Sequence, residues 1–174
     1  MNDPGSRYRP YIGVVGPGEA TAREAESAWQ VGALLAQRGA VIVCGGLSGV
    51  MEACADGAST EGGTVVGVLP GKDRNAANRH LSVALATGLG ELRNGVLVSA
   101  CDALIAVGGS WGTLSEVALA LQAGKPVVQL HGWDISVRAV DSRPPGRLPI
   151  RVCTPAEAVQ AVLPRRLEHP CRAA

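Results

Sequence analysis

Short apolar runs and amphipathic segments alternate along the whole chain, and glycine-rich turns often separate them. The apolar runs are almost uncharged and partly β-branched, as expected of strands buried on both faces of a parallel sheet. The amphipathic segments repeat apolar residues at helical spacing. Strands are predicted at residues 11–15, 40–44, 64–69, 82–86, 103–107, 126–130 and 150–153. Helices are predicted at about residues 22–38, 50–59, 93–101 and 155–163, and in the segment that ends near Gly124.

This alternation predicts an α/β fold, a doubly wound and mainly parallel Rossmann-like sheet with helices on both faces. In such sheets ligands bind beyond the carboxyl ends of the strands. A chain of 174 residues is long enough for one domain with a sizeable core, which we place at residues 11–163. Residues 1–10 are expected to form a flexible arm and residues 164–174 a basic tail. Residues 131–147 receive no assignment.

Composition narrows the class of protein. The formal net charge is +1, so neither a nucleic-acid partner nor a membrane surface is expected. No secretory signal and no membrane-spanning stretch is recognised, and we expect a cytoplasmic protein. The five cysteines are scattered and lack C-x-x-C spacing, which indicates reduced thiols that lie mostly in the core.

The stretch from Ala103 to Glu116 holds the main candidate chemistry. A buried strand ends at Gly108 and Gly109, Gly112 follows, and a helix begins at once. Glycines let the backbone approach a ligand, and the free amides and positive dipole end of a helix N-terminus suit an anion. We predict a phosphate site from backbone and side-chain donors here, formed by Gly109, Ser110, Trp111, Gly112 and Thr113.

Glu116 is unexpected in a pure phosphate site, because its negative charge lies about one turn from the anion. It is either a partner of the helix dipole or a group that serves a non-phosphate part of the ligand. Arg93 opposes the dipole at its own helix start, which points to a ligand, although solvation at the surface would also explain it. Trp111 either stacks a base at the rim of the site or plugs the loop.

A second glycine-rich turn follows the strand at 40–44 and should face the same crevice. Its candidate ligand-binding residues are Gly45, Gly46, Ser48 and Gly49. The turn after the first strand offers weaker candidates, Gly16 and Gly18. It lacks the G-x-G-x-x-G register of dinucleotide enzymes, and no lysine follows a Walker A pattern. NAD binding and Walker-type ATP hydrolysis are therefore disfavoured, and no metal site is predicted, since His80 and His131 have no companions at zinc spacing.

Three motifs resemble the LOG, or "lysine decarboxylase-like", family. Residues 45–51, GGLSGVM, are similar to its GGxxGxM signature, and residues 109–116, GSWGTLSE, to its PGGxGTxxE signature. Arg93, 23 residues before Glu116, matches the arginine of its E-R-K segment. The family includes cytokinin riboside 5′-monophosphate phosphoribohydrolases and molybdenum-cofactor carrier proteins, and this chain looks closer to the carrier-like branch. The resemblance departs from the hydrolases at Gly108, where they have proline, at Ser110 and at Asn94.

The resemblance implies that the crevice binds a nucleoside 5′-monophosphate or a related phosphorylated ligand similar to AMP. Whether the chain also cleaves the N-glycosidic bond is left open; Arg93 and Glu116 would be the catalytic residues of such cleavage, which needs no cofactor. The alternative is a non-catalytic carrier of a pterin (molybdenum) cofactor, and a weaker alternative is single-stranded DNA binding, as in a remoter relative. The resemblance also implies a homo-oligomer, a dimer or larger. Decarboxylation is rejected, because neither of the two lysines, Lys72 and Lys125, lies in a context suited to a Schiff base.

Overall fold

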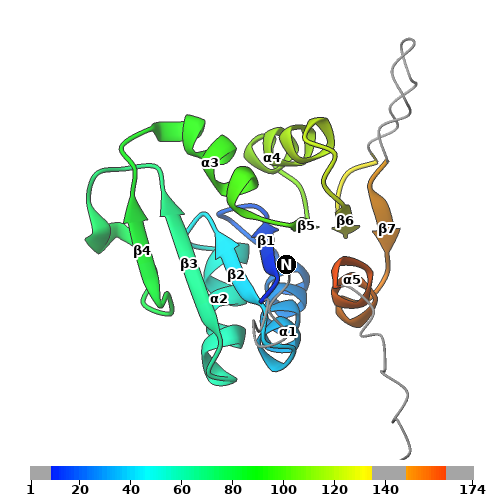
Figure 1. The fold of residues 1–174 in the computed structure, drawn as a ribbon. Helices are drawn as coiled ribbons and strands as arrows, with labels where there is room; N and C mark the ends of the chain where they lie inside the picture. The colour runs from blue at the N-terminus through cyan, green and yellow to red at the C-terminus, as the bar shows by residue number, and fades with distance from the viewer. Residues whose placement is uncertain (1–8, 135–147, 164–174) are drawn as a thin grey trace, which may run out of the picture.

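The structure is a computed structural model, and it describes residues 9–134 and 148–163. In this part of the chain, seven strands form one all-parallel sheet in the order β4-β3-β2-β1-β5-β6-β7 (Figure 1). The strands are β1 (Tyr11–Val15), β2 (Val41–Cys44), β3 (Thr64–Leu69), β4 (Val83–Ala86), β5 (Ala103–Val107), β6 (Val127–Leu130) and β7 (Ile150–Val152). The α-helices are α1 (Ala22–Gln37), α2 (Val50–Thr60), α3 (Arg93–Ala100), α4 (Trp111–Gln122) and α5 (Pro155–Val162), and two short 3₁₀ turns are η1 (Arg74–Ala76) and η2 (Gly90–Leu92).

The predicted α/β class is confirmed, and each predicted strand and helix is present within about two residues of its expected bounds. The sheet is parallel throughout, where a mainly parallel one was predicted. Most of the predicted arm (residues 1–8), the basic tail (164–174) and residues 135–147 lie outside the described residues. The domain bounds at 11 and 163 stay a prediction.

The strand order places a topological switch point between β1 and β5. From β1 the chain adds β2, β3 and β4 on one side, and then returns to place β5, β6 and β7 on the other side (Figure 1). The loops after β1 and β5 therefore lead to helices on opposite faces of the sheet, which opens a crevice between them. A Cβ on Gly16 would lie 2.5 Å from the carbonyl oxygen of Val107, so the two loops touch where they diverge.

Alternating side chains of the strands supply two apolar layers. Ile12, Ile42 and Ile105 pack in a core with residues of α1, α2 and α5, whereas Val43 and Leu104 pack on the other face with residues of α3 and α4. Both layers consist mainly of Val, Leu, Ile and Ala, as the absence of Phe from the sequence requires. Three of the cysteines lie in these layers as buried free thiols, Cys44, Cys54 and Cys101.

Glycines set the close contact between α1 and α2. A Cβ on Gly32 would overlap the carbonyl oxygen of Cys54, and a Cβ on Gly57 would overlap that of Trp29. The two helix backbones can approach this closely only because both positions lack a side chain. The contact fixes the position of α2, whose N-terminal turn borders the crevice.

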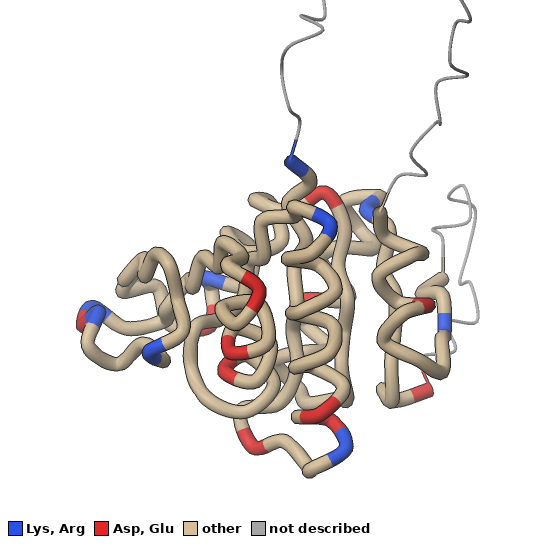
Figure 2. Tube along the Cα trace, turned by 90° about the horizontal axis from the view of Figure 1, so that it is seen from below, with Lys and Arg blue, Asp and Glu red and all other residues tan. Residues whose placement is uncertain are grey.

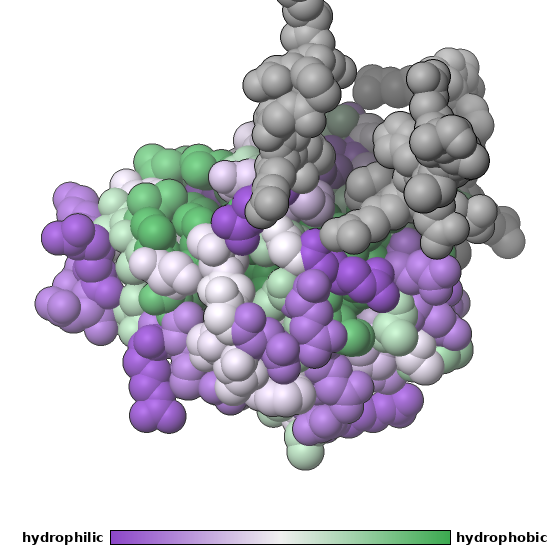
Figure 3. All heavy atoms as spheres, turned by 60° about the horizontal axis from the view of Figure 1, so that its bottom comes forward, coloured by the Kyte–Doolittle hydropathy of each residue, from purple (hydrophilic) through white to green (hydrophobic). Residues whose placement is uncertain are grey.

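The surface carries dispersed charges and some apolar area. Figure 2 shows the Lys and Arg of the described residues spread over several elements and not gathered in one stripe. On the face in Figure 3, hydrophobic residues gather toward the upper left, and hydrophilic residues cover much of the rest of the coloured surface. Exposed apolar side chains include Val83 and Leu85 on β4 and Leu92 at the end of η2. The homo-oligomer implied by the resemblance stays a prediction. None of the described helices has both the length and the apolar character needed to cross a membrane.

Gly32→Ala should lower the free energy of unfolding by about 1–3 kcal/mol, because the added methyl group forces α1 away from α2. Gly95→Ala is the matched control, since Gly95 is also helical but no atom lies within 4 Å of the added Cβ. It should leave stability unchanged or raise it by up to about 1 kcal/mol. Urea denaturation of both variants tests this, and equal effects at the two positions would contradict the close contact.

Candidate functional site

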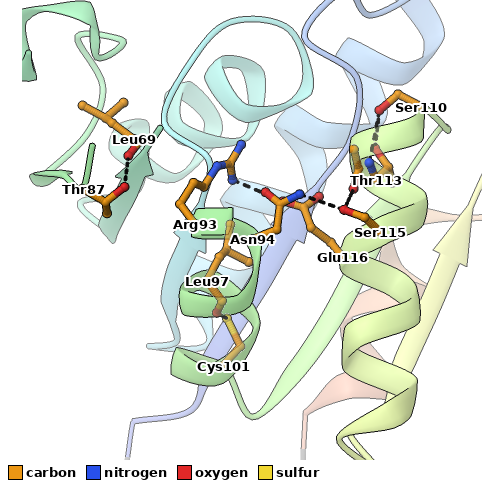
Figure 4. Close-up of polar contacts among 11 residues, drawn as sticks. Leu69, Thr87, Arg93, Asn94, Leu97, Cys101, Ser110, Thr113, Ser115 and Glu116 are labelled. Atoms are coloured by element: carbon orange, nitrogen blue, oxygen red, sulfur yellow. Dashed lines mark hydrogen bonds and ion pairs between the residues drawn. The ribbon is translucent and has the colours of Figure 1, made fainter. Parts of the chain in front are cut away.

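A buried ion pair joins α3 to α4. Nη1 of Arg93 lies 3.2 Å from Oε1 of Glu116, and the two residues are only 7% and 5% exposed. Figure 4 shows the two side chains pointing toward one another from the adjacent helices. The structure thus brings together the two residues that were predicted to act jointly. It also explains an arginine at a helix start, because the carboxylate offsets the unfavourable dipole interaction.

The glycine-rich turn after β2, which begins at Gly45, packs against Arg93 of this pair. A Cβ on Gly45 would lie 2.7 Å from both Nη atoms of Arg93 and 2.6 Å from the Met51 sulfur, so the guanidinium lies directly over the glycine. Within the described residues, the buried Nε of Arg93 has no hydrogen-bond partner. An unsatisfied buried donor on a charged group is costly, and it is a position where a ligand acceptor would be bound.

Asn94 extends the polar contact between the two helices. Its Nδ2 donates a hydrogen bond of 2.8 Å to Oγ of Ser115, which in turn donates to the carbonyl oxygen of Gly112 at 2.8 Å (Figure 4). Its buried Oδ1 has no partner in the described part of the chain. The residue that replaces the family's lysine therefore links α3 to the first turn of α4.

The N-terminus of α4 has the donors that an anion site needs. Ser110 is the N-cap residue, and its Oγ accepts from the Thr113 amide at 3.2 Å and lies 2.9 Å from the Thr113 hydroxyl. The polar groups of Thr113 are therefore engaged inside the protein, although the sequence assigned them to the ligand. No hydrogen bond among the described residues uses the amides of Gly109, Ser110, Trp111 or Gly112. These four amides remain as donors for an anion.

The glycines of the three turns have different reasons to be glycine. Added Cβ atoms would meet backbone atoms at Gly16, Gly46 and Gly49, so these glycines allow the turns to pack. At Gly18 and Gly112 an added Cβ would meet only one hydroxyl oxygen, at 3.8 Å in each case. Those two positions leave open space into which a ligand can approach the backbone. Ser48 supports the first turn, since its Oγ donates to the carbonyl oxygen of Gly18 at 3.0 Å.

Two tryptophans flank the predicted phosphate site. Trp111, the first residue of α4, is 80% exposed, so it does not plug the loop. Its ring centroid lies 5.4 Å from that of Trp133, with the rings at 74° in an edge-to-face arrangement. Trp133 was not predicted, because it lies in the segment that received no assignment. Its position, as an aromatic residue just after the strand predicted at 126–130, was the sequence signal that could have identified it as a candidate site residue.

Burial controls the ionisation of Glu116. The pKa of its carboxyl is raised from 4.5 to about 7. Loss of solvation is the largest cause, Arg93 acts in the opposite direction, and nearby Glu91 contributes a smaller increase. Near neutral pH this carboxyl can therefore either donate or accept a proton. Such a group, held beside a guanidinium, is suited to bind a polar ligand edge or to take part in proton transfer.

His80 and His131 both contact protein side chains. Nδ1 of His80 lies 3.2 Å from Oδ1 of Asp56, and Nε2 of His131 lies 3.0 Å from Oγ of Ser27. His131 also lines a separate hollow of about 370 Å³ near the carboxyl ends of β6 and β7, together with Arg23 and Arg151. Within the described residues, His, Cys, Asp and Glu side chains do not gather into a group of three that could hold a metal ion.

Comparison with protein-family models shows the family to which the chain belongs. The sequence model of the SLOG cluster4 family matches residues 9–159. The chain belongs to the SLOG cluster4 family. This match confirms the resemblance that the three sequence motifs indicated.

This SLOG cluster4 chain is similar to one curated protein and to two solved proteins that are named for the molybdenum cofactor. An uncharacterized protein of Archaeoglobus fulgidus is 47% identical over 119 residues, which cover 68% of this chain and 78% of that protein. The molybdenum cofactor binding protein from the phototrophic bacterium Rippkaea orientalis is 44% identical with a TM-score of 0.72, over 75% of this chain and 80% of that chain. The Moco carrier protein from Chlamydomonas reinhardtii is 34% identical with a TM-score of 0.78, over 89% and 96%.

Replacement of Glu116 by Gln should change how stability depends on pH. The carboxyl has a higher pKa in the folded protein than the 4.5 of the unfolded chain, so its contribution to stability is greatest below pH 4.5 and is lost as pH rises to about 7. Over that range wild type should lose roughly 3 kcal/mol relative to Glu116→Gln, since a tenfold change in proton affinity corresponds to about 1.4 kcal/mol. Urea denaturation of both proteins at pH 5, 6, 7 and 8 measures this difference, and parallel curves would contradict it.

Proposed function

We propose that this SLOG cluster4 protein binds the molybdenum cofactor, a phosphorylated pterin, and carries it without changing it chemically. The observation that carries the proposal is the N-terminus of α4, where four amides have no partner among the described residues. Such a helix end binds a phosphate group through its N–H donors and its dipole. The molybdenum is cargo, because the sulfur atoms of the cofactor hold the metal.

The buried pair suits the remainder of such a ligand. A pterin presents donors and acceptors side by side on one edge. The unpartnered Nε of Arg93 can donate to an acceptor, and the Glu116 carboxyl, with a pKa of about 7, can either donate or accept. In the proposed complex the Gly109–Gly112 amides hold the phosphate and this pair lies one helical turn away.

The position of Gly108 favours a carrier over the hydrolase reading that the motifs first suggested. The backbone of Gly108 has a φ of +69°, and its amide donates to the carbonyl oxygen of Leu130 at 2.8 Å. The hydrolase motif has proline here, and proline can neither adopt positive φ nor donate. The two similar proteins named for the molybdenum cofactor also support the carrier reading over the nucleotide one.

Cleavage of nucleoside 5′-monophosphates is the second candidate, and the Arg93–Glu116 pair is the observation in its favour. A carboxyl with a pKa near 7 beside a guanidinium could stabilise positive charge at the ribose or position a water. Single-stranded DNA binding remains the weaker alternative, because the Lys and Arg residues within the described part of the chain are dispersed in Figure 2 and such binding needs a basic groove.

The carrier proposal predicts that charge at position 112 controls binding. Gly112→Asp introduces a carboxylate where the added Cβ has space, and an acidic residue in the first turn does not destabilise a helix. It should weaken binding of the molybdenum cofactor at least tenfold by repelling the phosphate. Gly112→Asn has nearly the same shape without the charge and should weaken binding much less.

Purified protein is mixed anaerobically with molybdenum cofactor released from a molybdoenzyme, and molybdenum and pterin that co-elute with the protein on gel filtration are measured. Equal loss in the Asp and Asn variants would contradict a phosphate at the helix N-terminus. Absence of binding to wild type would refute the carrier proposal.

The two candidate functions differ in their product with AMP. A carrier releases no free adenine from AMP, whereas a hydrolase releases adenine and ribose 5-phosphate and loses this activity in Glu116→Ala. Chromatographic assay of adenine over several hours distinguishes them. We expect no release, and turnover that requires Glu116 would replace the carrier proposal by the hydrolase one.

A further inference from the structure

Trp111 is exposed to a degree that packing does not explain. It is the first residue of α4, it is 80% exposed, and its own amide is one of the four donors at the helix N-terminus. Of the three tryptophans in the chain, Trp29 lies on α1 beyond the opposite face of the sheet and is 36% exposed. A large aromatic side chain in solvent beside an anion site is typical of a residue that contacts the ligand.

Trp133 is held against the same loop. A Cβ on Gly109 would lie 2.9 Å from two atoms of the indole ring, so the ring can lie over the loop only because residue 109 is glycine. The edge-to-face contact, with 5.4 Å between ring centroids, orients Trp111 against Trp133. The two rings therefore form one aromatic surface, made from the start of α4 and the segment after β6.

The space beneath this surface is too small for a heterocycle. Trp133, Gly109, Ser110 and Gln129 are among the residues that line a hollow of about 10 Å³, which is room for about one water molecule. A ring that contacts the tryptophans must therefore lie on their solvent-facing side. The exposed indole of Trp111 offers such a face next to the four amides that have no partner among the described residues.

We propose that Trp111 and Trp133 form a stacking platform for the planar heterocycle of the ligand whose phosphate is bound at the N-terminus of α4. This inference rests on the proposed function, since it assumes a phosphorylated ring compound. Trp111 contributes the stacking face, and Trp133 fixes its orientation. The platform selects ligands that carry an aromatic ring over phosphorylated sugars of similar charge.

Two probes of equal phosphate content test the platform, a pterin monophosphate and ribose 5-phosphate, which has no aromatic ring. Isothermal titration calorimetry gives both affinities for wild type, Trp111→Ala, Trp111→Phe and Trp29→Ala. Trp111→Ala should bind the pterin phosphate roughly tenfold or more weakly, because base–aromatic stacking contributes this much per ring. Its affinity for ribose 5-phosphate should stay within about twofold of wild type. Trp111→Phe should recover most of the loss, and the remote Trp29→Ala should bind both probes as wild type does.

A second measurement reports on the platform directly. Stacking on Trp111 should quench the tryptophan fluorescence of wild type during titration with the pterin phosphate, and Trp111→Ala should lose most of this quenching. Thermal unfolding of Trp111→Ala should match wild type, because the side chain is almost fully exposed.

The outcomes separate the platform from the proposed function. If wild type binds the pterin phosphate and Trp111→Ala binds it equally well, the platform is overturned while the carrier proposal stands. If Trp111→Ala loses affinity for both probes to the same extent, Trp111 acts through the anion site and not by stacking. If wild type binds neither probe, both the platform and the phosphate site of the carrier proposal are overturned.

Discussion

The burial of one ion pair constrains the architecture of the site. Removing the Arg93 guanidinium and the Glu116 carboxylate from water costs several kcal/mol per ion, and the attraction between them offsets this only in part. The raised pKa of Glu116 expresses the same deficit, because the protein tolerates the charged carboxylate poorly even beside arginine. Two leucines at these positions would stabilise α3 against α4 more simply. The unpartnered Nε of Arg93 shows where the hydrogen-bonding capacity of the pair remains unused within the described residues.

The strand order explains why residues so far apart in sequence meet. Glu116 lies on the helix that follows β5, Gly45 follows β2 and Gly16 follows β1, and these three strands are adjacent in the sheet. Their carboxyl ends share one edge, so the turns after them converge. Several of the glycines in these turns serve the packing of the turns themselves. In these turns, only Gly18 and Gly112 open toward space that a ligand could use. The number of glycines in such a motif is therefore larger than the number that a ligand can contact.

Binding and catalysis make different demands on the same crevice. A carrier needs an anion site, a polar contact for the ring and a way to release the ligand, and a platform exposed to solvent serves release. A hydrolase needs water and a proton donor held against the scissile bond. The described site has an anion site and an exposed aromatic pair, which are features that a carrier needs. The Arg93–Glu116 pair could serve a carrier or a hydrolase. The proposed carrier would then share its fold with the similar Moco carrier protein of Chlamydomonas reinhardtii.

The sequence by itself determined the order and bounds of the elements, the parallel sheet and the glycine turns, because strand and helix periodicity and the backbone needs of glycine are local properties. It also paired Arg93 with Glu116 through motif spacing. Only the tertiary structure decided that Ser110 engages Thr113, that Trp111 is exposed and that Trp133 lies over Gly109. Those facts depend on contacts between segments distant in the chain, such as the segment after β6 and the loop before α4. Burial, and with it the raised pKa of Glu116, is likewise a property of how the layers pack and is absent from any single stretch of residues.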